Sequence, residues 1–167
     1  PLNKIGGAEK VIWSYFNNFK NLKIFLKLLI INNKDNINKL KNRNIINLNY
    51  SRFIYAIPKL LNTIKNNKIK IIISTFPNIS AILLILKFFK IIDIKIIVRQ
   101  PNIIEKSLSG SLKLYLLRNI YKFFIKFTDA VIVTSEFMKE EILKYNVNKE
   151  KIFLLRNPIS IAQTRKG

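Results

Sequence analysis

Four short apolar runs divide the chain from residue 69 onward: IKIIIST (Ile69–Thr75), IKIIVRQ (Ile94–Gln100), AVIVT (Ala130–Thr134) and IFLLR (Ile152–Arg156). Runs of this length that are rich in Ile and Val are typical of buried strands. Their apolarity is continuous rather than alternating, which suits a sheet covered on both faces. Because a helix-length amphipathic segment lies between each pair of runs, the sequence predicts an α/β fold with a mostly parallel sheet and helices on both faces.

Helices and two further strands are expected around these runs. Glu9 falls in the first turn of the first helix, where a negative charge suits the helix dipole, and Pro58 should kink or interrupt the second helix. Ser135 has the side chain of an N-cap residue for the last helix. The predicted helices are Ala8–Phe19, Ser51–Asn66, Asn78–Lys90, Ser111–Phe127 and Ser135–Tyr145; the further strands are Leu22–Ile31 and Asn44–Leu48, and Pro101–Ser109 is expected to be a loop.

The composition predicts one domain with a sizeable core. The chain has 167 residues, of which 49% are hydrophobic. It contains no cysteine and no histidine. This excludes disulfides, zinc sites built on Cys and His, and any catalytic triad or general base that needs His.

The charge is strongly positive. Lys and Arg outnumber Asp and Glu by 30 to 9, which gives a net charge of +21. Such a charge predicts attraction to an anionic surface, either nucleic acid or anionic lipid. The alternative is compositional, because Ile, Lys and Asn crowd the whole sequence as in a strongly AT-biased coding sequence. The compositional explanation is favoured for the total charge, although the attraction to polyanions follows from either.

Neither a secretory signal nor a transmembrane helix is predicted. The longest apolar region, Ile79–Val98, is interrupted by Lys87, Lys90, Asp93 and Lys95. It therefore lacks the roughly twenty apolar residues that a membrane-spanning helix needs.

Polar residues follow each predicted strand and also precede the first helix. Because the carboxyl ends of parallel strands meet at one edge of a sheet, these residues are expected to share that edge, where ligands bind in such folds. The residues expected there are Gly6, Gly7, Thr75, Asn78, Arg99, Asn102, Ser135, Glu136, Asn157 and Pro158.

Several of these positions have two explanations. Gly6 and Gly7 before a helix would let an anion approach backbone N–H groups, or form a simple tight turn; they fit neither a GxGxxG nor a Walker A motif. Arg99 could hold a phosphate or carboxylate with its planar guanidinium, or make a surface salt bridge to Glu105. Glu136 is either a site residue or a charge that suits the first turn of its helix.

The helix predicted at Ser111–Phe127 combines basic and aromatic residues. Arg118, Lys122 and Lys126 are spaced by four and line one side. A basic amphipathic helix with aromatic residues can lie on a membrane surface. A core helix with a solvated basic stripe is commoner and is the favoured interpretation. The aromatic residues around the stripe are Tyr115, Tyr121, Phe123, Phe124 and Phe127.

Four groups of residues, in order along nearly the whole chain, form a recognisable set. They are GGAEK (Gly6–Lys10), VRQPN (Val98–Asn102), TDAVIVTS (Thr128–Ser135) and the segments EEIL, NKEKI and RNPI between Glu140 and Ile159. In turn they resemble a GG-x-E-[RK] loop, an Arg-x-x-Asn loop, an ADAVIAVS strand and an EELLK…PEKIxVIPNGVD run. These are motifs of family 4 glycosyltransferases, which have the GT-B fold.

The resemblance implies a Rossmann-like, acceptor-side N-terminal domain at residues 1–158, with 159–167 as a tail or the start of an interdomain linker. A second domain would bind the nucleotide sugar, and catalysis would occur in the cleft between the domains. By position, Gly6, Gly7 and Glu9 would form the loop that faces the donor diphosphate and the acceptor. The acceptor side of the cleft would contain Thr75, Asn78, Arg99, Asn102, Ser135 and Glu136, and Asn157 and Pro158 would begin the crossing to the second domain.

The resemblance also implies a reaction and a setting. Family members usually retain the anomeric configuration and usually need no metal, so the nucleotide sugar would be a co-substrate and no cofactor is expected. The expected acceptor is a glycan or a lipid-linked sugar, with an anionic membrane surface as a further partner and no specific nucleic acid. The expected location is cytoplasmic, at the inner face of the membrane. No catalytic residue is assigned.

The chain departs from the family pattern at both ends. The first strand, which should precede Gly6, is absent or reduced to Pro1–Ile5, and Pro158–Ser160 replaces the Gly-Val-Asp of the motif. The nucleotide-binding domain with its glutamate pair is also absent. We therefore expect a fragment or a split half that is inactive on its own.

Two other functions stay open from the sequence. One is a non-catalytic basic α/β module that binds a polyanion. The other is half of a sugar-nucleotide epimerase with a similar two-domain fold. The loop of Gly6 to Glu9 favours the transferase.

Overall fold

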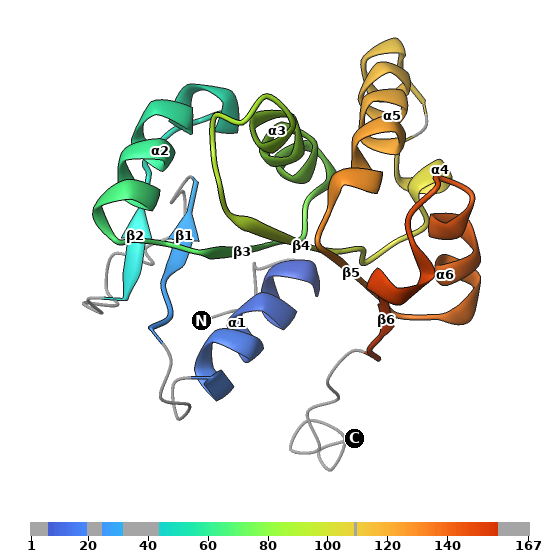
Figure 1. Ribbon diagram of the computed structural model, residues 1–167, viewed down its shortest axis with the longest axis horizontal. Helices are drawn as coiled ribbons and strands as arrows, with labels where there is room; N and C mark the ends of the chain where they lie inside the picture. The colour runs from blue at the N-terminus through green and yellow to red at the C-terminus, as the bar shows by residue number, and fades with distance from the viewer. Residues whose placement is uncertain (1–6, 20–24, 32–43, 109, 157–167) are drawn as a thin grey trace.

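A parallel sheet lies at the centre of the molecule (Figure 1). The computed structural model describes residues 7–19, 25–31, 44–108 and 110–156. Four strands form the central sheet in the order β3-β4-β5-β6, and each pairs in parallel with the next. They are β3 (Ile71–Ser74), β4 (Lys95–Arg99), β5 (Ala130–Val133) and β6 (Ile152–Leu154). The predicted α/β fold with a parallel sheet is confirmed.

Two shorter strands form a second parallel sheet. β1 (Leu28–Ile30) pairs with β2 (Ile45–Asn47), and within the described residues neither strand pairs with the central sheet. The strand predicted at Leu22–Ile31 is thus shorter than expected, and its first three residues lie outside the described residues. Residues 32–43, which join the two strands, also lie outside them.

Helices cover both faces of the central sheet, as the sequence predicted. Figure 1 shows α2, α3 and α5 on one side of the sheet and α1 on the other. The α-helices are α1 (Gly7–Phe19), α2 (Ile57–Asn66), α3 (Pro77–Phe88), α4 (Ile104–Ser107), α5 (Leu112–Phe124) and α6 (Glu136–Leu143). Short 3₁₀ helices are η3 (Phe53–Ala56), η4 (Ile125–Phe127) and η5 (Lys149–Lys151).

The helix boundaries follow local chemistry in two places that the sequence predicted. The Oγ of Ser135 accepts a hydrogen bond from the N–H of Met138 at 3.3 Å, which confirms Ser135 as the N-cap of α6. Pro58 lies in the first turn of α2, directly after η3, so it divides the predicted helix in two. In contrast, the segment Pro101–Ser109 is not only a loop, because it contains the one-turn helix α4.

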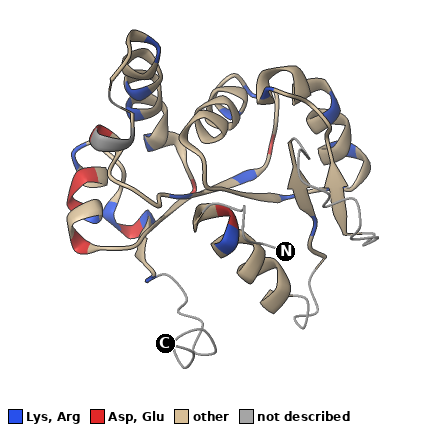
Figure 2. Ribbon diagram, turned by 180° about the vertical axis from the view of Figure 1, so that it is seen from behind, with Lys and Arg blue, Asp and Glu red and all other residues tan. Residues whose placement is uncertain are grey.

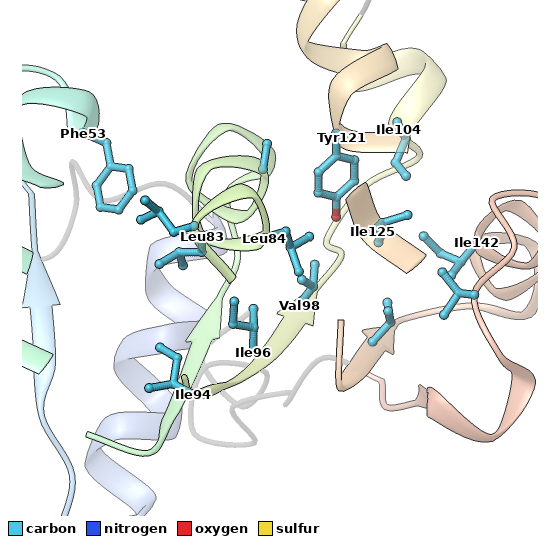
Figure 3. Close-up of a cluster of buried hydrophobic side chains, with 14 of the residues drawn as sticks. Phe53, Leu83, Leu84, Ile94, Ile96, Val98, Ile104, Tyr121, Ile125 and Ile142 are labelled. Carbon is cyan, nitrogen blue, oxygen red and sulfur yellow. The ribbon is translucent and has the colours of Figure 1, made fainter. Parts of the chain in front are cut away.

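The main core lies between the sheet and the layer of α3 and α5. Leu83 and Leu84 of α3 and Ile96 and Val98 of β4 are at most 1% exposed, and Figure 3 shows Leu84 beside Val98. Tyr121 of α5 is fully buried in the same cluster. The apolar runs of the sequence therefore form the strands that carry the core.

A polar junction at the start of β5 joins four elements. The Asp129 carboxylate accepts a hydrogen bond from the Ile96 N–H of β4 at 2.6 Å and forms an ion pair with Lys87 of α3. The Thr128 hydroxyl donates to the Ile96 carbonyl at 2.8 Å, and Lys151 of η5 donates to the Thr128 carbonyl at 3.0 Å. Thr128 and Asp129 thus set how β4, α3 and η5 lie around β5.

The ionised form of Asp129 is favoured in the folded protein. Partial burial opposes ionisation, but hydrogen bonds from Lys87 and Ile96, with the charges of Lys87 and Lys151, outweigh it and lower the pKa of Asp129. A carboxyl whose pKa is lower in the folded state stabilises the fold above its ordinary pKa and loses that contribution as the pH falls.

We predict that Asp129→Ala lowers the free energy of unfolding by about 2 kcal/mol at neutral pH, since a charged acceptor of a backbone N–H is removed. The matched control is Asp93→Ala, because Asp93 is exposed, and its effect should stay within about 0.5 kcal/mol. Urea unfolding of both variants measures this. As the pH falls below about 4, the difference between wild type and Asp129→Ala should shrink. A difference that does not change with pH would contradict the assigned role of the carboxylate.

Candidate functional site

The carboxyl ends of the central strands form one edge of the sheet. Hydrogen bonds continue the pairing up to this edge, from the Gln100 N–H to the Ile132 carbonyl and from the Leu155 N–H to the Val133 carbonyl, both at 2.8 Å. Thr75, Arg99 and Ser135 follow or end their strands and therefore lie along it. This edge is where ligands bind in parallel α/β sheets.

Arg99 is the last residue of β4 and is 1% exposed. Its neighbour Val98 pairs in register with Ser74, whose hydroxyl lies 2.8 Å from the hydroxyl of Ser80 on α3. Successive strand residues point to opposite faces, so Arg99 lies on the face away from α3. Figure 1 shows α1 on that face.

The burial of Arg99 excludes one of its two sequence-based explanations, and the binding of a phosphate or carboxylate stays a prediction. A residue that is 1% exposed makes no surface salt bridge, so the expected surface pair with Glu105 is wrong. The carboxylate of Glu105 instead accepts from Lys122 of α5 at 2.6 Å, and this hydrogen bond and the charge of Lys122 lower the pKa of Glu105. Arg99 is also more buried than expected of a charged residue that ends a strand.

Thr75 follows Ser74 just as Arg99 follows Val98, so the register brings Thr75 and Arg99 side by side. Thr75 is 4% exposed, and its hydroxyl has no hydrogen-bond partner among the described residues. Buried hydroxyl groups usually have a partner, and one without a partner calls for an explanation such as a bound ligand or water. Two of the predicted site residues are therefore brought together at this edge.

The loop after β4 is held by a buried amide that the sequence analysis did not single out. Gln100 is 1% exposed, and its Oε1 accepts a hydrogen bond from the Tyr121 hydroxyl at 2.7 Å. Its Nε2 donates to the carbonyl of Asn102 at 2.5 Å. Gln100 therefore fixes the path of the backbone directly after Arg99. The side chain of Asn102 itself is exposed.

A buried carboxylate holds the next part of the same loop. Glu141 of α6 is 6% exposed and accepts hydrogen bonds from the N–H groups of Ile104 at 3.0 Å and Glu105 at 3.2 Å. These N–H groups begin α4, where no residue within the helix can accept from them. The Tyr145 hydroxyl also donates to Glu141, at 3.4 Å. Glu141 thus caps α4 and ties the loop to α6.

The two tyrosines around this loop stay protonated. Burial raises the pKa of Tyr121, and the charge of Glu141 and the nearby Tyr145 raise it further. Burial likewise raises the pKa of Tyr145, again with the charge of Glu141. Both hydroxyl groups therefore remain hydrogen-bond donors at neutral pH, which keeps the contacts to Gln100 and Glu141 intact.

A signal for Glu141 was present in the sequence. Met138, Glu141, Ile142 and Tyr145 share helical spacing, so the glutamate lies on the buried stripe of its helix. A carboxylate on an apolar stripe is almost always paired. The sequence carried no comparable signal that its partners would be backbone N–H groups of a loop 37 positions away.

Ser135 and Glu136 have local roles at the start of α6. Ser135 caps the helix, and the carboxylate of Glu136 pairs with Lys139 at 3.4 Å. Both residues are exposed at the carboxyl edge. The first-turn role of Glu136 is therefore observed, and its assignment to the acceptor side of a cleft stays a prediction.

The remaining predicted site residues are exposed or lie outside the described residues. Asn78 is exposed in the first turn of α3, whose N-cap residue Phe76 makes no capping hydrogen bond through its side chain. Glu9 is exposed in the first turn of α1, and a Cβ added to Gly7 would meet no atom within 4 Å. Open space at Gly7 leaves room for a ligand. Gly6, Asn157 and Pro158 lie outside the described residues.

Three further observations on the described residues bear on function. Among them, no group of three or more Asp and Glu side chains is placed to hold a metal ion, and no helix is both long and apolar enough to cross a bilayer. Away from the strand edge, a shallow hollow of about 310 Å³ lies between α5 and the end of α6.

We predict that Glu141→Ala lowers the free energy of unfolding by about 3 kcal/mol, because two backbone N–H groups lose a charged acceptor. Glu140→Ala is the matched control in the same helix, where the side chain is exposed, and should cost at most about 0.5 kcal/mol. Urea unfolding measures both. Equal effects of the two substitutions would show that Glu141 does not anchor the loop.

Comparison with known proteins agrees with this architecture. The chain matches the family model described as Glycosyltransferase Family 4 over residues 5–163. Comparison with curated proteins gives no significant match. The matched region includes the central sheet, the carboxyl edge and the loop after β4. The chain therefore belongs to glycosyltransferase family 4.

Proposed function

We propose that this domain is the acceptor-side half of an enzyme that moves a sugar from a nucleotide-sugar donor to an acceptor, with retention of the anomeric configuration. The observation that supports this most directly is the position of Arg99, which is 1% exposed and is the last residue of β4 in the central sheet. The unpartnered Thr75 hydroxyl lies beside it in register. Together they offer a cation and a hydroxyl at the edge where this fold binds ligands.

In this proposal the acceptor lies against Arg99 and Thr75, and a second domain holds the donor. The acceptor hydroxyl oxygen forms a bond to the anomeric carbon, the bond from that carbon to the nucleoside diphosphate breaks, and the hydroxyl proton passes to the departing diphosphate. The guanidinium would hold an anionic or hydroxyl group of the acceptor, an interaction that is stronger in a buried site than in water. The first turn of α1, with Gly6 and Gly7, would face the donor diphosphate.

The loop after β4 would give the site its shape. Gln100 holds the carbonyl of Asn102, and Glu141 holds the backbone N–H groups two and three positions later, through hydrogen bonds of 2.5–3.2 Å. A fixed loop costs little entropy when substrate binds, so the acceptor can be oriented by groups that are already in place. Asn102 is exposed on this loop and would contact the acceptor directly.

The proposed setting is the cytoplasmic face of a membrane, with a lipid-linked or polysaccharide acceptor. The net charge of +21 supports an anionic acceptor or surface. The family match favours a transferase over the epimerase that the sequence left open. Apart from the nucleotide-sugar co-substrate, the proposal includes no cofactor and no metal ion.

The decisive test is substitution of Arg99 in the full-length enzyme. Arg99→Lys keeps the charge but loses the planar fork, so kcat/KM should fall about tenfold or more. Lys95→Ala is the control, because Lys95 is exposed at the amino end of the same strand, and it should leave kcat/KM unchanged. Urea unfolding of both variants separates lost activity from lost stability. If Arg99→Lys is stable and its kinetics match those of the wild type, Arg99 is not part of the site.

A further inference from the structure

Helix α5 has two apolar faces, and only one of them packs in the protein. Leu114, Leu117, Tyr121 and Phe124 face the core. On the other side, four apolar residues at helical spacing face solvent: Leu112 is 76% exposed, Leu116 54%, Ile120 41% and Phe123 53%. We call these four residues the outer ridge. Isolated exposed apolar residues are ordinary, but a continuous stripe along a whole helix indicates a contact surface.

Aromatic rings extend the outer ridge beyond α5. The ring of Phe123 lies 6.2 Å from that of Phe127, which lies 4.8 Å from the ring of Phe88 at the end of α3. Phe89, next to it, is 65% exposed, and its ring lies 5.2 Å from that of Phe88. The apolar surface therefore runs from the start of α5 to the end of α3.

One flank of the outer ridge is basic. Arg118 lies over the ring of Tyr115 at 5.0 Å, and Lys126 lies over the ring of Phe123 at 4.3 Å. The sequence of α5, LKLYLLRNIYKFF, contains no acidic residue, and Figure 2 shows blue but no red positions along this helix. Aromatic and aliphatic groups beside Lys and Arg are the composition of helices that lie in the interface of a bilayer.

The hollow between α5 and the end of α6 lies beside the ridge. It is lined by Lys122, Lys126 and Lys144, with the amide side chains of Asn119 and Asn146. Three lysines and two asparagines around about 310 Å³ give the hollow a positive charge, which favours a phosphate group. Lys122 also pairs with Glu105, which leaves Lys126 and Lys144 as the lysines of the hollow whose removal breaks no ion pair in the described residues.

We propose that the outer ridge and the lysines of the hollow dock this domain onto an anionic phospholipid bilayer, with a lipid phosphate in the hollow. The ridge would enter the boundary between headgroups and acyl chains, and the lysines would lie at the phosphate level. Charge favours a bilayer over a second copy of this chain, since two copies would bring the same basic flank together at a net charge of +21 each.

This surface deepens the proposed function, which puts the acceptor at a membrane. Lipid binding can be measured without catalysis, however. A protein that binds vesicles but transfers no sugar would contradict only the proposed function. An active enzyme that does not bind vesicles would contradict only the docking surface.

The first experiment tests the apolar contact with the full-length protein. The probe is co-sedimentation with vesicles of phosphatidylcholine that contain phosphatidylglycerol, with pure phosphatidylcholine vesicles for comparison. The variant Leu116→Ser with Phe123→Ser should bind the anionic vesicles at least about tenfold more weakly, because two large apolar side chains are lost. The matched control is Phe25→Ser with Ile54→Ser, which removes equally exposed apolar side chains near β1 and in η3 and should bind as the wild type does.

The second experiment tests the hollow. Lys126→Gln with Lys144→Gln should weaken binding by about fivefold per lysine, since each lysine near an anionic surface contributes about 1 kcal/mol. Lys65→Gln with Lys68→Gln removes the same charge from exposed positions at the end of α2 and should have a smaller effect. Equal weakening by both pairs would mean that net charge alone drives binding, which overturns the proposal.

Sedimentation of the protein without lipid tests whether a second copy of this chain covers the outer ridge instead of a bilayer. If the wild type dimerises and Leu116→Ser with Phe123→Ser makes it monomeric, a second copy covers the outer ridge and the proposal is wrong. A monomeric wild type that needs both the ridge and the hollow for vesicle binding would establish the docking surface.

Discussion

The carboxylate of Asp129 holds the amino ends of the central strands in place. It accepts from a backbone N–H of β4 and pairs with a lysine of α3, and the adjacent Thr128 binds the same strand. These contacts set the register in which β4 and β5 run toward the opposite edge. Since Arg99 is opposite Ile132 in that register, the position of the candidate site depends on a junction at the far end of its strand.

A second set of polar contacts holds β4 at its other end. Gln100 and Glu141 are both buried. Both form hydrogen bonds to the backbone of the loop that follows Arg99, and Gln100 also accepts a hydrogen bond from the Tyr121 hydroxyl. A buried polar network destabilises the fold when some of its groups lack a hydrogen-bond partner, and it makes the structure rigid when all of them have one. Arg99 therefore lies on a strand that hydrogen bonds hold at both ends. Such a strand keeps the position of a binding residue constant.

The parts of the fold that depend on local chemistry could be predicted from the sequence. The four apolar runs, the cap at Ser135 and the interruption at Pro58 follow from residue properties within a few positions. The helix α4 could not be predicted, because the group that caps it is Glu141 on a distant helix. The burial of Arg99 was missed for a similar reason, since a charged residue at a strand end is ordinarily solvated. On α5 the basic stripe was recognised, but whether the apolar residues next to it face the core or solvent depends on how the helix packs.

The separation of the two sheets has a consequence for motion. β1 and β2 are hydrogen-bonded to each other over three residues each, and the end of β2 is tied to α2 through the Lys59 ammonium, which donates to the carbonyls of Asn47 at 3.3 Å and Leu48 at 3.1 Å. Within the described residues, no strand hydrogen bond links this pair to the central sheet. Leu29 and Ile46 of the pair pack against the hydrophobic core, so side-chain packing rather than strand hydrogen bonds joins it to the central sheet. The amide protons of β1 and β2 should exchange with solvent through local opening. Those of β4 and β5 should exchange only when the whole domain unfolds.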